Sequence, residues 1–223
     1  MLSDYWMEKL CKLLSHKTNI TAPDTYVALF TTIPTRDGTG GTEVTGAGYA
    51  RQIINPNGGA SPAWGAPASQ TTKEWRFNNA NAISWTASGA NYGDVVGFGI
   101  YDAATVGNLL LADFFTGEFM AGIVTDSAST DTIKSDAHGL SNGNRVCVRM
   151  IPGTTIPTGL SETTLYYVVN ANTDDFQVSL TAGGAAVALT GDGEIMFAKV
   201  TPRTVNDGET ISISANALQL FQA

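Results

Sequence analysis

The first residues with types suited to chemistry are the histidines, of which the sequence has two. His138 lies in the run DAHGLS, where Asp136 could orient the imidazole and Ser141 could act as a nucleophile. The run has no G-x-S-x-G turn, and a histidine in a polar turn before a strand has a simpler structural role. His16 follows a helical pattern, where a basic side chain favours the helix C-terminus. We therefore expect no catalytic residue and no enzyme activity.

The glycine-rich and threonine-rich loop within residues 31–52 is a second candidate, because such loops can bind phosphate. A phosphate loop needs G-x-x-x-x-G-K-[ST] and a helix that starts directly after it. Here the glycines precede a strand-like segment, Tyr49-Ala50-Arg51-Gln52, and the loop has no lysine. Asp37 and Glu43 would repel phosphate. The remaining interpretation is contact with a neighbouring subunit, since glycine permits close backbone approach.

Metal and redox chemistry have little support in the sequence. Its aspartates, such as Asp126, Asp131 and Asp136, are not spaced as a short-range ligand cluster. Cys11 and Cys147 are far apart, each in an apolar pattern, and we expect both to be buried free thiols. We predict no metal and no cofactor.

Four aromatic residues, Trp64, Trp75, Trp85 and Tyr92, leave open a surface that stacks on a host glycan. Trp75 and Trp85 lie in strand-like patterns and are expected in the core, whereas Trp64 lies in a loop rich in proline and glycine and is expected to be exposed. An exposed Trp64 could also anchor a subunit contact, as aromatic residues often do.

The composition narrows the class of protein. The chain has 223 residues, 43% of them hydrophobic and only 14% charged, with a net charge of −8. An acidic chain repels nucleic-acid backbones, so we expect no direct nucleic-acid binding. No apolar run of about 18 residues is present, and we expect neither a membrane span nor a signal peptide at MLSDYWMEKLCKLL.

The elements that must position any site are one helix and many strands. Residues 3–16 are predicted to form a helix capped by Ser3, with Trp6, Leu10, Leu13 and Leu14 on one apolar face. That face must pack on the β core of its own chain or on a neighbour. From residue 25 onward the pattern changes to the period of strands, interrupted by loops rich in glycine and proline.

Residues 119–194 contain short strands every 8 to 12 residues or so, separated by turn residues, as in a small barrel or sandwich. We predict a mainly β fold. A β-sandwich or barrel-like core with the N-terminal helix would comprise residues 1–118 and 195–223. A second small β domain, residues 119–194, would be inserted near the C-terminal hairpin, and insertion requires that its two ends lie close together.

Several motifs resemble a widespread family of tailed-bacteriophage virion proteins. They are YVALFT (26–31), DGTGGTEV (37–44), GYARQ (48–52), FGIYDAA (98–104), GNLL (107–110) and TVNDGET (204–210). They occur in family order, and relatives are labelled tail-fibre-like, minor tail or head-decoration proteins. The insert, with HGLSNG and LYYVVN, is similar to a small β module that recurs in phage structural proteins. The family pattern supplies no catalytic residues.

The resemblance implies a structural role in the virion, for a chain made in the host bacterial cytoplasm. We expect a capsid decoration (cement) protein on the outside of the head, with the major capsid protein and copies of itself, as a homotrimer, for partners. The alternative is a tail fibre, collar or receptor-binding component, with a host surface glycan as ligand. The expected contact residues are Trp6, Arg36, Glu43, Tyr49, Arg51 and Trp64. Deletion of residues 38–47 is expected to leave the β core folded but to prevent incorporation into particles.

Overall fold

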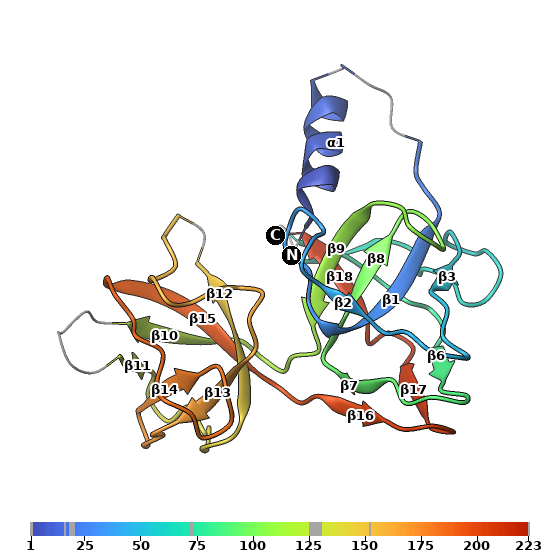
Figure 1. The fold of residues 1–223 in the computed structure, drawn as a ribbon. Helices are drawn as coiled ribbons and strands as arrows, with labels where there is room; N and C mark the ends of the chain where they lie inside the picture. The colour runs from blue at the N-terminus through green and yellow to red at the C-terminus, as the bar shows by residue number, and fades with distance from the viewer. Residues whose placement is uncertain are drawn as a thin grey trace. The chain divides into compact units, whose positions relative to one another are not determined.

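The structure, a computed structural model, describes residues 2–15, 17, 21–71, 74–124, 131–151 and 153–222 (Figure 1). His16 and Asp126 lie outside these residues. Over the described ranges the fold is mainly β, with one helix and eighteen strands, which confirms the predicted fold class. The chain forms two compact units: unit 1 is Met1–Asp113 with Arg203–Ala223, and unit 2 is Phe114–Pro202.

The main sheet of unit 1 is built around one long, doubly buried strand. Its members are β1 (Thr25–Thr32), β2 (Thr42–Glu43), β3 (Gln52–Ile54), β8 (Gly97–Tyr101) and β9 (Leu109–Phe114). The strand order is β2-β1-β8-β9, and β3 also pairs with β1, so β2 and β3 pair with opposite ends of β1. The central residues of β1, from Val27 to Phe30, are buried, which explains why both faces of this strand are apolar in the sequence.

The last part of the chain completes unit 1 by pairing with strands from the first part. The strands outside the main sheet are β4 (Ala68–Thr71), β5 (Glu74–Asn78), β6 (Ile83–Thr86), β7 (Gly93–Val95), β16 (Arg203–Val205), β17 (Thr210–Ile213) and β18 (Gln219–Gln222). β16 pairs with β7, β17 with β6, and β18 with β5, which also pairs with β4. Residues 206–209 separate β16 from β17, but each of these strands pairs with a strand far away in the sequence, so the two do not form the expected C-terminal hairpin.

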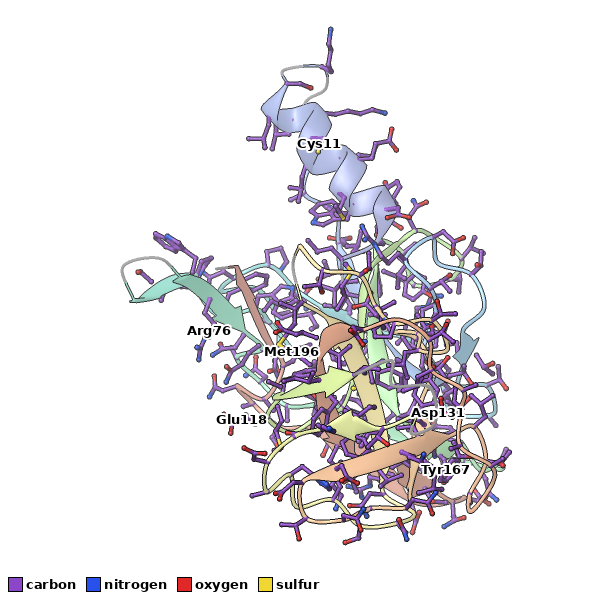
Figure 2. All side chains as sticks on the ribbon, turned by 90° about the vertical axis from the view of Figure 1, so that its left-hand side faces the viewer. Cys11, Arg76, Glu118, Asp131, Tyr167 and Met196 are labelled. Carbon is purple, nitrogen blue, oxygen red and sulfur yellow. The ribbon has the colours of Figure 1, made fainter. Side chains whose placement is uncertain are left out.

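The only helix of the described chain, α1, runs from Asp4 to Leu14 and begins as predicted. The Ser3 side chain caps it by accepting a hydrogen bond from the Trp6 N–H (3.2 Å). None of the helix residues is buried. Cys11 is therefore exposed on α1 (Figure 2), and the prediction that both cysteines are buried is wrong for Cys11 and confirmed for Cys147. Cys11 lies beside the apolar stripe rather than on it, about 100° around the helix from Leu10.

Unit 2 is a closed six-stranded barrel. Its strands are β10 (Met120–Val124), β11 (Ile133–Lys134), β12 (Arg145–Met150), β13 (Tyr166–Val169), β14 (Asp175–Ser179) and β15 (Gly193–Val200), in the order β10-β11-β14-β13-β12-β15. Phe176 and Phe197 pack edge to face in its core with centroids 5.0 Å apart. The two ends of the unit lie side by side, because Thr116 and Val200 form an antiparallel bridge. The division into independently folding domains stays a prediction.

Candidate functional site

Three of the predicted contact residues, Glu43, Tyr49 and Arg51, meet in one cluster beside β1. Arg51 donates from Nε to Glu43 Oε1 (2.9 Å) and from Nη2 to Glu43 Oε2 (2.7 Å), a two-point ion pair. The Tyr49 hydroxyl donates to Glu43 Oε1 (2.9 Å) and accepts from the Leu29 N–H of β1 (2.9 Å). The three side chains thus bond to one another instead of pointing separately outward.

Arg51 also reaches the loop between β8 and β9. Its Nη1 donates to the carbonyl oxygens of Ala103 (3.1 Å) and Val106 (2.7 Å). The guanidinium lies 3.5 Å from the centroid of the Tyr101 ring, within cation–π distance. Only 9% of the Arg51 side chain is exposed, so this cation is held almost entirely by protein groups.

Tyr49 is the neutral member of the cluster. Burial, reinforced by the adjacent Glu43 carboxylate, raises the pKa of the Tyr49 hydroxyl far above its ordinary value of 10.0. Its ring also meets the ring of Tyr92 edge-on at 5.7 Å. Tyr49 therefore remains a hydrogen-bond donor to Glu43 over the whole physiological range of pH.

The cluster fixes the second half of the glycine-rich and threonine-rich loop, which follows β2. Glu43 is in β2 and Tyr49 and Arg51 precede β3, so their bonds close the segment between these strands. The following Val44 is buried, and its N–H donates to the Leu29 carbonyl (2.9 Å). A deletion of residues 38–47 would remove β2, Glu43 and a core residue, so the expectation that this deletion spares the β core no longer has a structural basis.

The exposed tip of the loop is ordered by its own polar groups. Asp37 Oδ1 accepts hydrogen bonds from the Thr39 N–H (3.0 Å) and the Thr39 hydroxyl (2.8 Å), and it is also bonded to the Thr35 hydroxyl. These bonds, the Thr35 one first, lower the pKa of Asp37 from 3.8 to about 2. A Cβ on Gly41 would lie 2.8 Å from the Pro34 backbone nitrogen, which is the close approach that glycine permits.

Arg36 ties this loop to the start of α1. Its Nη2 lies 3.1 Å from Asp4 Oδ1 and 2.8 Å from the Met7 sulfur, and its carbonyl accepts from the Asp4 N–H (2.9 Å). About 100° around the helix from Met7, Trp6 lines an open apolar groove of about 380 Å³. This α1 groove is defined by Trp6 and Leu10 of α1, Trp75 and Phe77 of β5, Leu111 of β9 and Leu220 of β18.

The tryptophans differ from their predicted positions in two of three cases. Trp85 is buried, as predicted. Trp75 is 62% exposed at the α1 groove, so its prediction as a core residue is wrong. Trp64 is half-buried, because its Nε1 donates to the Thr25 hydroxyl (2.9 Å) and its ring meets Phe77 at 5.1 Å. Trp64 therefore lies apart from the Glu43 cluster and does not stand free in its loop.

His138 has a structural environment. It is 5% exposed, its Nδ1 accepts from the Leu140 N–H (3.0 Å), and its Nε2 is 3.2 Å from the Asp175 carbonyl oxygen, to which it donates. Its ring packs against Phe176 at 5.0 Å. Both ring nitrogens thus have backbone partners, so neither is directed at Ser141.

Among the described residues, no group of three or more His, Cys, Asp or Glu side chains is arranged to hold a metal ion. Within the same ranges, no helix is long and apolar enough to cross a membrane.

Sequence reasoning missed the α1 groove. The helical stripe of Trp6 and Leu10 signalled one wall, but β5, β9 and β18 come from three distant segments whose pairing no local pattern encodes. Nothing in the sequence indicated the other wall, because the strand pattern around Trp75 predicted a core position for that side chain.

Comparison with known proteins assigns the chain to a family. The sequence model of the family described as podophage GP4 fiber I protein gp80 matches residues 1–118, more than half of the chain. The chain belongs to this family, which consists of phage structural proteins and not of enzymes, and its place is in the virion. Comparison with curated proteins gives no match.

Proposed function

We propose that the protein is an exterior subunit of a podophage particle, in which unit 1 is the docking base and unit 2 carries a separate contact. The family match supports this division, because it covers residues 1–118 and stops near the start of unit 2 at Phe114. All six expected contact residues lie inside the matched range.

The observation that carries the proposal is the cluster of Glu43, Tyr49 and Arg51. It holds the second half of the glycine-rich and threonine-rich loop, between β2 and β3, in one conformation before any partner binds. Bonds among Thr35, Asp37 and Thr39 order the tip of the loop in the same way. A preformed loop loses little conformational freedom on association, so more of its contact energy is available for binding. Its exposed threonine hydroxyls and backbone amides supply donors and acceptors for a neighbouring subunit. The cluster itself acts in this proposal by positioning the loop rather than by contact.

Two positions on the particle are compatible with such a subunit. The description of the family as a fiber I protein favours a fibre component on the tail. The alternative, a decoration protein that binds the outer surface of the head as a homotrimer and holds capsomers together, is favoured by the short helix and by the absence of any repeat in the sequence. In either position, binding only to the assembled particle stabilises it by mass action, and many copies make modest contacts sufficient.

The partners in this proposal are other copies of the chain and a particle protein, which is the major capsid protein for the head position. For the tail position the added partner is a host surface glycan bound through exposed aromatic residues. Trp75 is the described tryptophan with the exposure that such stacking needs.

The copy number per particle tests the position. Quantitative mass spectrometry of purified particles against the major capsid protein is the measurement. Hundreds of copies would support the head, and a dozen or two would support the tail or a vertex. Absence from purified particles would overturn the proposed role altogether.

A second measurement tests the loop. A variant that replaces Thr35, Asp37 and Thr39 by alanine removes the bonds that order the tip and leaves β2 intact. We expect this variant to fold and to be depleted from particles. The control is Asn57→Ala, in the exposed loop after β3.

A further inference from the structure

Helix α1 carries an apolar stripe that the chain itself leaves open. Trp6 and Leu10 begin the stripe inside the α1 groove, and Leu13 and Leu14 continue it beyond the groove. Leu10, Leu13 and Leu14 are 36%, 44% and 80% exposed, and Met7 beside them is 41% exposed. Four large apolar side chains on one side of an exposed helix form the kind of patch that marks an interaction site.

The groove beside this stripe has the complementary form. Its other wall comes from β5, β9 and β18, and Trp75 at its margin is 62% exposed. The stripe is a row of leucines on a helix, and the groove is an apolar trough that runs along a helix. Every copy of the chain presents both features, so the stripe of one copy fits the groove of another.

We infer that the α1 groove and the stripe form a self-association surface, in which α1 of a second copy packs along α1 and inserts its leucines into the groove. This inference rests on the self-association in the proposed function and names the surface that makes it.

The available area agrees with a second copy as the occupant. The exposed parts of Met7, Leu10, Leu13, Leu14 and Trp75 amount to on the order of 500 Å² per copy, so two copies would bury about 1,000 Å². That is the lower bound for a specific protein–protein interface. The apolar side chains alone reach it, before any polar rim is counted.

Charge also permits two copies to meet here, although the whole chain has a net charge of −8. α1 carries two acids and two lysines, so the helix itself is neutral. Asp4 pairs with Arg36, and Glu8 pairs with Lys12 one turn away. The stripe itself contains no charged residue, so packing two helices along it brings no like charges of α1 together. The cations beside it are Arg36, which pairs with Asp4 and lies 2.8 Å from the Met7 sulfur, and Arg76, which lines the groove.

The test is the mass of the full chain by light scattering at a series of concentrations. We expect the wild type to exceed the monomer mass, and we expect Leu13→Gln/Leu14→Gln and, separately, Trp75→Ala to raise the dissociation constant at least tenfold. Leu180→Gln is the matched control, because Leu180 is a 63% exposed leucine of unit 2. It should associate like the wild type. A dimer or a trimer that responds in this way supports the inference.

Three results would overturn it. They are a wild type that stays monomeric at all concentrations, association that neither variant weakens, and weakening by the control as great as that by the variants. A wild type that stays monomeric but binds another virion protein through the stripe would also overturn the inference. The unfolding curves of the variants must match that of the wild type, and we expect this because the replaced leucines are exposed. If Leu13→Gln/Leu14→Gln does not fold, the milder Leu14→Ser replaces it in the test.

Particle analysis separates this inference from the proposed function. Monomeric protein that is nevertheless found in purified particles would sink the self-association surface and leave the virion role intact. Association through the stripe by a protein that is absent from particles would support the self-association surface and overturn the virion role.

Discussion

Arg51 and Glu43 form a two-point ion pair whose guanidinium is 9% exposed and whose carboxylate is 25% exposed. The same guanidinium also bonds two backbone carbonyls and covers the Tyr101 ring. This concentration of bonds on one side chain makes Arg51 the residue that joins the segment between β2 and β3 to the β8–β9 loop.

Arg51→Ala should destabilise unit 1 by about 3 kcal/mol, because it leaves the Glu43 carboxylate half-buried without its cation. Arg36→Ala is the matched control, since its pair with Asp4 is 43% and 62% exposed and should contribute less than about 1 kcal/mol. Urea unfolding of both variants gives the comparison. Equal losses for the two arginines would contradict the special role of the cluster.

Alkaline pH should weaken unit 1 through Tyr49. The folded state raises the pKa of Tyr49 above the value of 10.0 for an ordinary tyrosine, so above pH 10 the unfolded chain releases a proton that the folded chain retains. The contribution of Tyr49 is therefore complete below pH 10 and is lost as the pH rises toward the pKa of the folded state. Unfolding free energies measured between pH 8 and 11 should fall less steeply for Tyr49→Phe than for the wild type. Parallel slopes would count against this assignment.

Gly48→Ala should cost more than Gly58→Ala, although both glycines have positive φ, +80° and +73°. Both substitutions carry the strain of a left-handed residue, roughly 1–2 kcal/mol. At Gly48 the added Cβ would also lie 2.8 Å from the Thr86 carbonyl oxygen, whereas at Gly58 nothing is within 4 Å. Thermal unfolding should show the larger loss for Gly48→Ala, by about 1–3 kcal/mol. A larger loss at Gly58 would mean that the Thr86 contact is easily relieved.

Unit 2 should fold alone as residues 114–202, because it is a closed barrel with its own core and paired ends. Circular dichroism should show a single cooperative melting transition. Within that fragment, His138→Ala should cost about 2 kcal/mol by leaving the Leu140 N–H and the Asp175 carbonyl without their partner. A fragment without a cooperative transition would refute the predicted domain division.

Local features were predictable from the sequence. The helix with its Ser3 cap, the strand character of residues 25–32 and the change of pattern in the insert depend on neighbouring residues, and the structure has all three. The side that a strand buries is not local. Trp75 lies in β5, which pairs with β4 and β18, and whether its side chain points to core or solvent depends on which layer covers that small sheet.

The candidate site was predictable only as separate residues. Glu43, Tyr49 and Arg51 stood out by type, but their mutual bonds require β2 and β3 to pair with the same strand, β1. Pairing between segments 20 or more residues apart has no signature in either segment alone. The likeness to phage virion proteins gave the class of protein, which the family match confirms, and could not give the position on the particle.

The bridge between Thr116 and Val200 has a consequence for how such a chain can change over time. The chain enters and leaves unit 2 at two neighbouring backbone positions. Another domain with adjacent termini could therefore replace unit 2 at the same point without changing the path of the chain through unit 1. Recombination at one locus would then exchange unit 2 and leave unit 1 unchanged. The same junction offers a place to graft foreign peptides for display.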